Sequence, residues 1–132
     1  MSNVLFVCIQ NAGRSQISQA LFARAAEGRH GARSAGSRPA AHVHDEAVAV
    51  LEEIGIDVSG NVPHLLDQAD MEWADVVVTM GCGDECPYIP GRRYIDWELA
   101  DPAGRPLDQV RALRDEIATR VEALVEELDA AG

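Results

Sequence analysis

The segment from Cys8 to Ser15 contains the residue types and spacing best suited to chemistry in this chain. It reads Cys-x5-Arg-Ser, and Gly13 stands directly before Arg14. A cysteine beside the N–H groups of a loop and of a first helical turn is favoured as a thiolate, the nucleophilic form of the side chain. The planar guanidinium of Arg14 offers a fork that holds two oxygens of a tetrahedral anion. The segment therefore predicts attack by Cys8 on a bound oxyanion.

The other residues of this loop are assigned to substrate binding and to support of the thiolate. Gly13 permits backbone conformations that other residues avoid, Ser15 is a hydrogen-bond donor for the sulfur, and the Asn11 amide pins the loop. The alternative is a structural cysteine at the end of a strand and a surface arginine; a strand before the loop and a helix after it favour the catalytic interpretation. The predicted substrate-binding residues are Cys8, Ile9, Gln10, Asn11, Ala12, Gly13 and Arg14.

Alternating strands and helices must position this loop. Apolar runs and periodic patterns predict strands over residues 4–7, 32–35, 75–80 and 93–97, and helices over 16–26, 45–54, 67–73 and 107–128. This alternation predicts one domain, residues 1–132, of class α/β: three layers with a central four-stranded parallel sheet flanked by helices. Ligands of such sheets bind beyond the carboxyl ends of the strands, and both Cys8 and Cys82 follow strands there.

Composition excludes several classes of function. The net charge is −11, from 22 acidic and 11 basic residues, which argues against nucleic acid and anionic membranes as partners. All the basic residues are arginines, so a lysine base or a Schiff-base lysine is excluded. The sequence has no apolar run of the roughly 20 residues that span a bilayer and no signal-peptide pattern, so we expect a cytoplasmic protein.

Cys82 and Cys86 are the only cysteines besides Cys8, and an odd total in a cytoplasmic chain makes a disulfide framework a poor interpretation. They are reactive thiols, metal ligands or passive loop residues. A metal site with His42, His44 or His64 fits zinc spacing poorly, and we predict no metal there. The histidines are expected to be surface or capping residues.

Asp101 precedes Pro102, which restricts Asp101 to extended geometry. A carboxylic acid held over the Cys8 loop is placed to protonate a leaving oxygen.

Taken together, these motifs resemble the low-molecular-weight tyrosine phosphatase superfamily over essentially the whole chain, and within it the arsenate reductases. Where the phosphatases carry aromatic residues after Asp-Pro, this sequence has Ala103-Gly104, so the wall for a tyrosine ring is absent. The segments that resemble the reductases are Ser34-Ala35-Gly36, Val77-Val78-Thr79-Met80, Cys86-Pro87, Asp101-Pro102-Ala103-Gly104 and Arg114-Asp115-Glu116-Ile117.

The resemblance implies an arsenate reductase of the thioredoxin-coupled type. In the implied relay Cys8 attacks arsenate, Cys82 attacks Cys8 and releases arsenite, and Cys86 passes the oxidation to a Cys82–Cys86 disulfide that thioredoxin reduces. The implied catalytic residues are Cys8, Arg14, Ser15, Asp101, Cys82 and Cys86.

Three alternatives stay open. One is a tyrosine phosphatase, a second is a reductase that uses mycothiol or glutathione with a glutaredoxin-like partner, and the third is a non-catalytic oxyanion or redox sensor. For any of them phosphate and sulfate are expected analogues of arsenate.

The resemblance implies no required cofactor. Some relatives bind potassium beside the loop through a glutamate of the first helix, and this chain has Gln19 at that place. Asn11, Ser34 and Asp67 remain as potassium ligands.

Overall fold

A parallel four-stranded sheet forms the centre of the computed structural model, which describes residues 1–81 and 90–131. The strand order is β2-β1-β3-β4, and every neighbouring pair is parallel. All carboxyl ends therefore lie at one edge, where Cys8 ends the inner strand β1 and is paired with Gly36. The strands are β1 (Asn3–Cys8), β2 (Gly31–Gly36), β3 (Val76–Thr79) and β4 (Arg93–Asp96).

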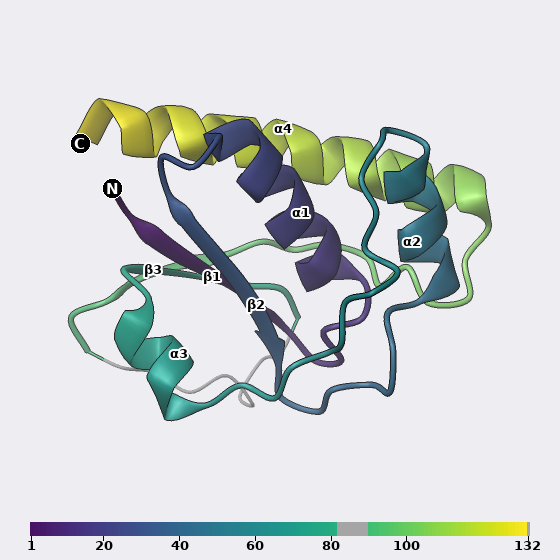
Figure 1. Cartoon of the computed structure of the whole chain (residues 1–132), viewed down its shortest axis with the longest axis horizontal. Helices are drawn as coiled ribbons and strands as arrows, with labels where there is room; N and C mark the ends of the chain where they lie inside the picture. Colours follow the sequence, from purple (N-terminus) through teal and green to yellow (C-terminus); the bar gives the residue numbers. More distant parts are fainter. Residues whose placement is uncertain (82–89, 132) are drawn as a thin grey trace.

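Helices cover both faces of the sheet (Figure 1). Helices α1 (Arg14–Ala26), α2 (Asp45–Glu52) and α4 (Leu107–Ala131) lie on one face, and α3 (Gln68–Trp73) lies on the other. This arrangement confirms the predicted three-layer α/β fold with its parallel sheet.

Strand β1 is buried on both faces, which explains its unbroken apolar run. Side chains alternate along the strand, so Phe6 and Cys8 belong to the core beneath α1 and α4 while Leu5 and Val7 pack with the residues of the α3 layer. The ring of Phe6 lies 5.9 Å from that of Trp97. The loop after β1 therefore emerges from a strand in which every residue from Val4 to Cys8 is buried.

The helix boundaries differ from the predicted ones by a few residues. α1 begins at Arg14 rather than at residue 16, because Gly13 is the residue that precedes the first helical turn. α2 ends at Glu52, and Gly55 with φ +84° provides the turn that the sequence indicated as a stop. α4 continues to Ala131.

The outer edge of β2 is covered at its carboxyl end. Leu65 forms a parallel bridge with Gly36, whose N–H donates to the His64 carbonyl (2.8 Å) and whose carbonyl accepts from Leu66 (2.9 Å). This pairing brings the surface segment 64–66 beside the loop that follows β1, which the sequence did not predict.

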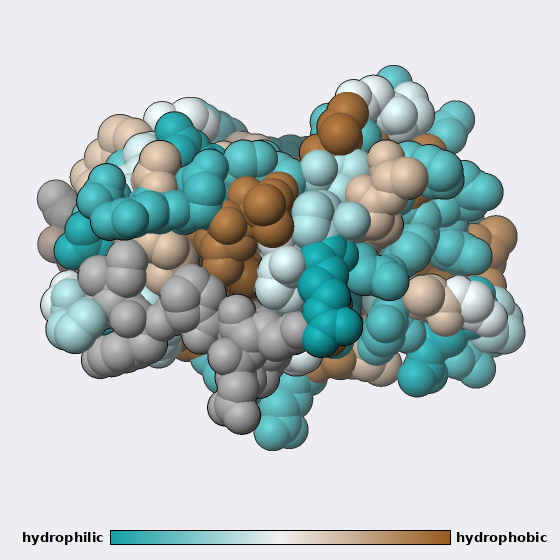
Figure 2. Space-filling view, turned by 90° about the horizontal axis from the view of Figure 1, so that it is seen from below, coloured by the Kyte–Doolittle hydropathy of each residue, from teal (hydrophilic) through white to brown (hydrophobic). Residues whose placement is uncertain are grey.

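Figure 2 shows a face of the molecule on which hydrophilic residues predominate and apolar residues gather in small areas, the largest near the centre. In residues 1–81 and 90–131, no helix has both the length and the apolar composition that a membrane crossing requires.

Candidate active site

A small pocket lies at the carboxyl end of β1, where the sequence placed the chemistry. Its volume is about 120 Å³, and it is lined by Cys8, Ile9, Gln10, Gly13, Arg14 and Asp101. The structure thus brings together the predicted nucleophile, the predicted anion-binding arginine and the predicted acid, although Asp101 is far away in sequence. A pocket of this size suits one small tetrahedral oxyanion rather than an extended substrate.

The Cys8 sulfur has hydrogen-bond partners despite its burial. It lies 2.9 Å from Ser15 Oγ, and it accepts a hydrogen bond from the backbone N–H of Asn11 at 3.3 Å. Asn11 adopts a left-handed conformation (φ 51°), which Asn tolerates better than most residues. The Asn11 N–H is a donor to the sulfur, and in the contact with Ser15 either the hydroxyl or the thiol can donate.

The backbone of the loop is turned so that its carbonyls point away from the pocket. The carbonyls of Cys8, Ile9, Gln10 and Ala12 accept hydrogen bonds from the N–H groups of Ser37, Arg38, Ala40 and His44, at 2.8–3.3 Å. Gly13, at the start of α1, has no side-chain cap. The N–H groups of the first helical turn are therefore left for an anion.

Arg14 is held at the wall of the pocket with only 11% of its side chain exposed. Its Nη1 donates to the Leu99 carbonyl (3.3 Å) and its Nη2 lies 3.9 Å from Asp101 Oδ2. A Cβ atom added to Gly81 would lie 2.6 Å from Arg14 Nη1, and Gly81 has φ +80°. The position of the Arg14 guanidinium thus requires a residue without a side chain at position 81.

The Asp101-Pro102 turn lies on top of the loop. Pro102 Cγ is 2.7 Å from the place where a Cβ of Gly13 would be, so only glycine permits this contact. Asp101 Oδ1 accepts from the N–H of Ala103 (3.0 Å), and the Asp101 side chain is 56% exposed. The carboxyl group is consequently accessible to solvent protons at the wall of the pocket that Cys8 lines, which is the placement that a general acid requires.

Two of the predicted catalytic residues, Cys82 and Cys86, lie outside the described residues. Gly81, which precedes Cys82 in the sequence, is the last described residue before them and lies against Arg14.

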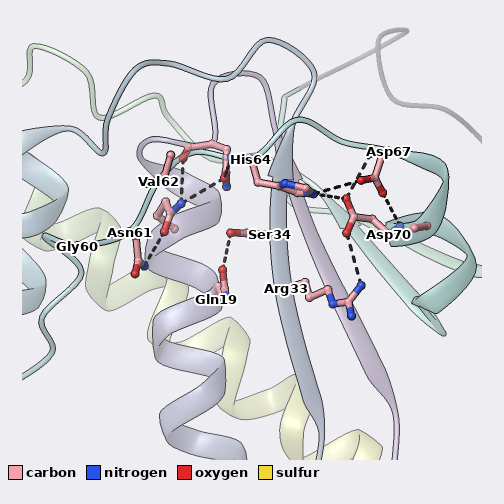
Figure 3. Close-up of a pocket in the computed structure, with 12 residues that line it drawn as sticks. Gln19, Arg33, Ser34, Gly60, Asn61, Val62, His64, Asp67 and Asp70 are labelled. Atoms are coloured by element: carbon pink, nitrogen blue, oxygen red, sulfur yellow. Dashed lines mark hydrogen bonds and ion pairs between the residues drawn. The ribbon is translucent and has the colours of Figure 1, made fainter.

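A second, larger cavity of about 610 Å³ adjoins the same loop. Figure 3 shows residues that line it, among them Ser34 and Asp67, two of the three expected potassium ligands, and Gln19, which stands where some relatives carry a glutamate; the third expected ligand, Asn11, lines the cavity too. The backbone N–H of Asp70 donates to Asp67 and holds the pKa of Asp67 below its ordinary value. The cavity also contains Arg33, whose positive charge opposes a cation.

Two residues near this cavity were missed by the sequence analysis. Gln16, which is 3% exposed, donates to both oxygens of Asn11, and the N–H of His64 donates to Asn11 Oδ1. His64 was expected to be a surface or capping residue, and its side chain is 49% exposed. No sequence signal marks it, since its contact with the loop is made by the main chain.

Comparison with known proteins agrees with this geometry. Residues 3–132 match the family described as low molecular weight phosphotyrosine protein phosphatase. The glutaredoxin arsenate reductase of Synechocystis is 34% identical over 95% of this chain and 97% of its own length.

Two solved structures are also similar. The thioredoxin-dependent arsenate reductase of Corynebacterium glutamicum is 38% identical with a TM-score of 0.88; the match covers 100% of this chain and 64% of that one. The YwlE arginine phosphatase of Geobacillus stearothermophilus is 28% identical with a TM-score of 0.88, over 99% of this chain and 95% of that one.

These matches confirm the predicted fold and the prediction of an enzyme, and they confirm the resemblance to arsenate reductases. The chain belongs to the low molecular weight phosphotyrosine protein phosphatase family.

Proposed function

We propose that this enzyme reduces arsenate to arsenite with Cys8 as the nucleophile. The observation that carries the proposal is the pocket itself, in which the Cys8 sulfur, the Arg14 guanidinium and the Asp101 carboxyl surround a volume of about 120 Å³. Arsenate is a compact tetrahedral anion, and a thiolate at the base of an anion site is the group required to attack its arsenic. Relatives named arsenate reductases at 34% and 38% identity support this substrate.

In the first step the Cys8 thiolate attacks arsenic and a sulfur–arsenic bond forms. An arsenate oxygen departs as water after protonation by Asp101, and arsenic stays at oxidation state five. Arg14 and the first-turn N–H groups hold the remaining oxygens, which carry the negative charge.

In the second step the Cys82 thiolate attacks the Cys8 sulfur. A Cys8–Cys82 disulfide forms, the sulfur–arsenic electron pair stays with arsenic, and arsenite leaves at oxidation state three. Cys86 then attacks Cys82, which frees the Cys8 thiolate and leaves a Cys82–Cys86 disulfide. An external dithiol takes up this oxidation, so two electrons enter for each arsenate reduced.

The electron donor is the second part of the proposal, and we choose thioredoxin. Retention of both Cys82 and Cys86 supports an internal relay, and the Corynebacterium relative is named thioredoxin-dependent. The Synechocystis relative carries glutaredoxin in its name, so a glutaredoxin with glutathione is the donor to compare.

The experiment is arsenate-dependent NADPH oxidation, with thioredoxin and thioredoxin reductase or with glutaredoxin, glutathione and its reductase. We expect turnover with thioredoxin in the wild type and none in Cys82→Ser. Cys86→Ser should release one arsenite per enzyme and then stop as the Cys8–Cys82 disulfide. Full steady turnover of Cys86→Ser with thioredoxin would refute the relay.

A phosphatase is the second candidate, and the arginine phosphatase similarity at a TM-score of 0.88 favours testing it. No aromatic residue is among those that line the pocket in the described part of the chain, which disfavours an aryl phosphate. Steady hydrolysis of a phosphate ester or phosphoarginine, unchanged in Cys82→Ser and without arsenate turnover, would establish the phosphatase instead. Binding of arsenate without turnover under any reductant would indicate a sensor.

Potassium is proposed as an optional modulator rather than a cofactor. Asn11, Gln19, Ser34 and Asp67 supply oxygens around one cavity, but only Asp67 among them is charged, and Arg33 shares the space. Replacing potassium chloride by choline chloride at equal ionic strength should therefore change kcat/KM only a few-fold. A loss of all activity in choline chloride would show that the ion is required.

A further inference from the structure

Two exposed side chains, Gln10 and Asp101, form the rim of the small pocket. The other described residues that line it are buried or partly buried and form its base: Cys8, Ile9, Gly13 and Arg14. A group attached to an anion at the base must therefore leave the pocket past the two rim residues. The proposed reaction assigns a role to Asp101 but not to the side chain of Gln10.

A hydrogen bond from His44 fixes the side chain of Gln10. His44 Nε2 lies 3.0 Å from Gln10 Oε1, and because an amide oxygen can only accept, the imidazole N–H is the donor. The oxygen of the Gln10 amide is therefore engaged on the side of His44. The other branch of the amide carries two N–H groups, which are donors that suit an oxyanion.

His44 is itself held against the loop. Its backbone N–H donates to the Ala12 carbonyl at 2.9 Å, and it is the residue directly before the first turn of α2. A Cβ atom added to Gly13 would lie 3.5 Å from His44 Cδ2 and 2.7 Å from Pro102 Cγ. The imidazole and the proline thus approach the same glycine, so one imidazole lies near both parts of the rim.

We propose that Gln10 is a specificity-determining residue and that His44 is its positioning residue. Gln10 donates an amide N–H to an outward oxygen of the bound anion, and its side chain narrows the opening through which a substituent would extend. A free oxyanion has a charged oxygen at this place. An ester carries a carbon group there, and a phosphonate has carbon in place of the oxygen, so both lose the charge-assisted hydrogen bond.

The substrate class that follows is a free inorganic oxyanion rather than an ester. The inference rests on the proposed binding of an oxyanion against Cys8 and Arg14, but not on the reduction of arsenate.

The test compares the dissociation constants of inorganic phosphate and of phenylphosphonate, which cannot be hydrolysed. Both are measured as protection of Cys8 from iodoacetamide, in a Cys82→Ser, Cys86→Ser background where Cys8 is the only thiol. With Gln10 present, phosphate should bind about tenfold more tightly, the contribution of one hydrogen bond to a charged group. Gln10→Ala should reduce this preference to about threefold or less, because phosphate binds more weakly and phenylphosphonate more tightly.

Gln10→Glu separates the hydrogen bond from the width of the opening. The carboxylate has nearly the same shape and still accepts from His44, but it has no N–H group and it is charged. Phosphate should bind at least about tenfold more weakly than with Gln10, and phenylphosphonate should gain nothing, because the opening stays narrow. Unchanged binding of phosphate by Gln10→Glu would overturn the role as donor.

The role of His44 is tested through the same preference for phosphate. His44→Ala should shift it in the direction of Gln10→Ala but by a smaller factor, and His44→Gln, which keeps an N–H donor, should restore it. In the Gln10→Ala background, His44→Ala should cause no further shift. His42→Ala is the matched control, because His42 is exposed on the same segment, and both dissociation constants should stay as they are.

The preference itself decides the inference. An unchanged preference in folded Gln10→Ala, or equal shifts in His42→Ala and His44→Ala, would overturn it; if Gln10→Ala fails to fold, Gln10→Ser carries the same expectation. Protection by phosphate without arsenate turnover would refute the proposed reduction and leave the role of Gln10 intact. No protection of Cys8 by phosphate or arsenate at any concentration would refute both.

Discussion

The two cavities that share the Cys8–Ser15 loop differ in size and in chemistry. The cavity with Cys8 has a volume of about 120 Å³ and contains an arginine beside a buried thiol, whereas the cavity with Asn11 has about 610 Å³ and mixes amides, carboxylates and Arg33. The smaller one is the proposed oxyanion site, while the residues of the larger one support the loop from behind. Volume is therefore a poor guide to where the chemistry lies in this molecule.

The largest difference is expected between the arginines of the two cavities. Arg14→Lys removes the planar fork from the anion site and should lower kcat/KM for arsenate by about 10²–10³-fold. Arg33→Lys makes the same change in the large cavity and should stay within about threefold, since no oxyanion contact is lost. Steady-state kinetics with thioredoxin would measure both, and equal losses would contradict the distinction.

Removal of the proposed acid ranks next. Asp101→Asn cannot donate a proton and should lower kcat about 10²-fold, the contribution typical of general acid catalysis. Asp67→Asn in the large cavity is the matched control, for which kcat should change only a few-fold. An Asp101→Asn enzyme of normal kcat would show that water or another group protonates the leaving oxygen.

A smaller effect is expected from the glycine that faces Arg14. Gly81→Ala places a methyl group 2.6 Å from Arg14 Nη1, and we expect about a tenfold fall in kcat/KM, because the guanidinium is displaced. Gly28→Ala is matched in backbone strain, with φ +81° against +80°, but has no atom within 4 Å. It should lower Tm without changing kcat/KM, and a similar kinetic loss in both variants would exclude the contact as the cause.

The smallest effect concerns stability and pH in the large cavity. The pKa of Asp67 is held below its ordinary value of 3.8, mainly by the Asp70 backbone N–H, so the ionised form stabilises the fold above that value. This contribution is lost as the pH falls through the lowered pKa. Asp67→Asn should therefore lower Tm by a few degrees near neutral pH, and the gap should close in acid. A gap of constant size would indicate that the charge of Asp67 does not matter.

Local patterns were sufficient to predict most of the fold and the central part of the site. The apolar run of β1 and the periodic spacing of α4 predicted those elements, and Cys8, Gly13 and Arg14 predicted the pocket. Such signals are contained within a few neighbouring residues, so one sequence carries them. The role of Asp101 was predicted from the proline that follows it, together with the presence of the Cys8 loop.

The support of the loop was not predictable in the same way. His64 and Gly36 are in contact through backbone groups. Because every residue has these groups, the types of residue in the sequence do not predict the contact. Asp70 stands among polar residues in the sequence, a pattern typical of the surface. In the structure it is nevertheless buried, in contact with Arg33 and His64. The roles of Cys82 and Cys86 remain predictions, since both lie outside the described residues.

The bridge between Gly36 and Leu65 has a consequence for self-association. β2 is an edge strand, and an open edge is a template on which a second chain can add a strand. At the catalytic end, segment 64–66 already takes the N–H and the carbonyl of Gly36. The stretch that shields this edge is also the one that orders Asn11. Heat or substitutions that detach it expose an unpaired strand and release the Asn11 side chain of the site loop together, so inactivation and aggregation should begin in the same transition.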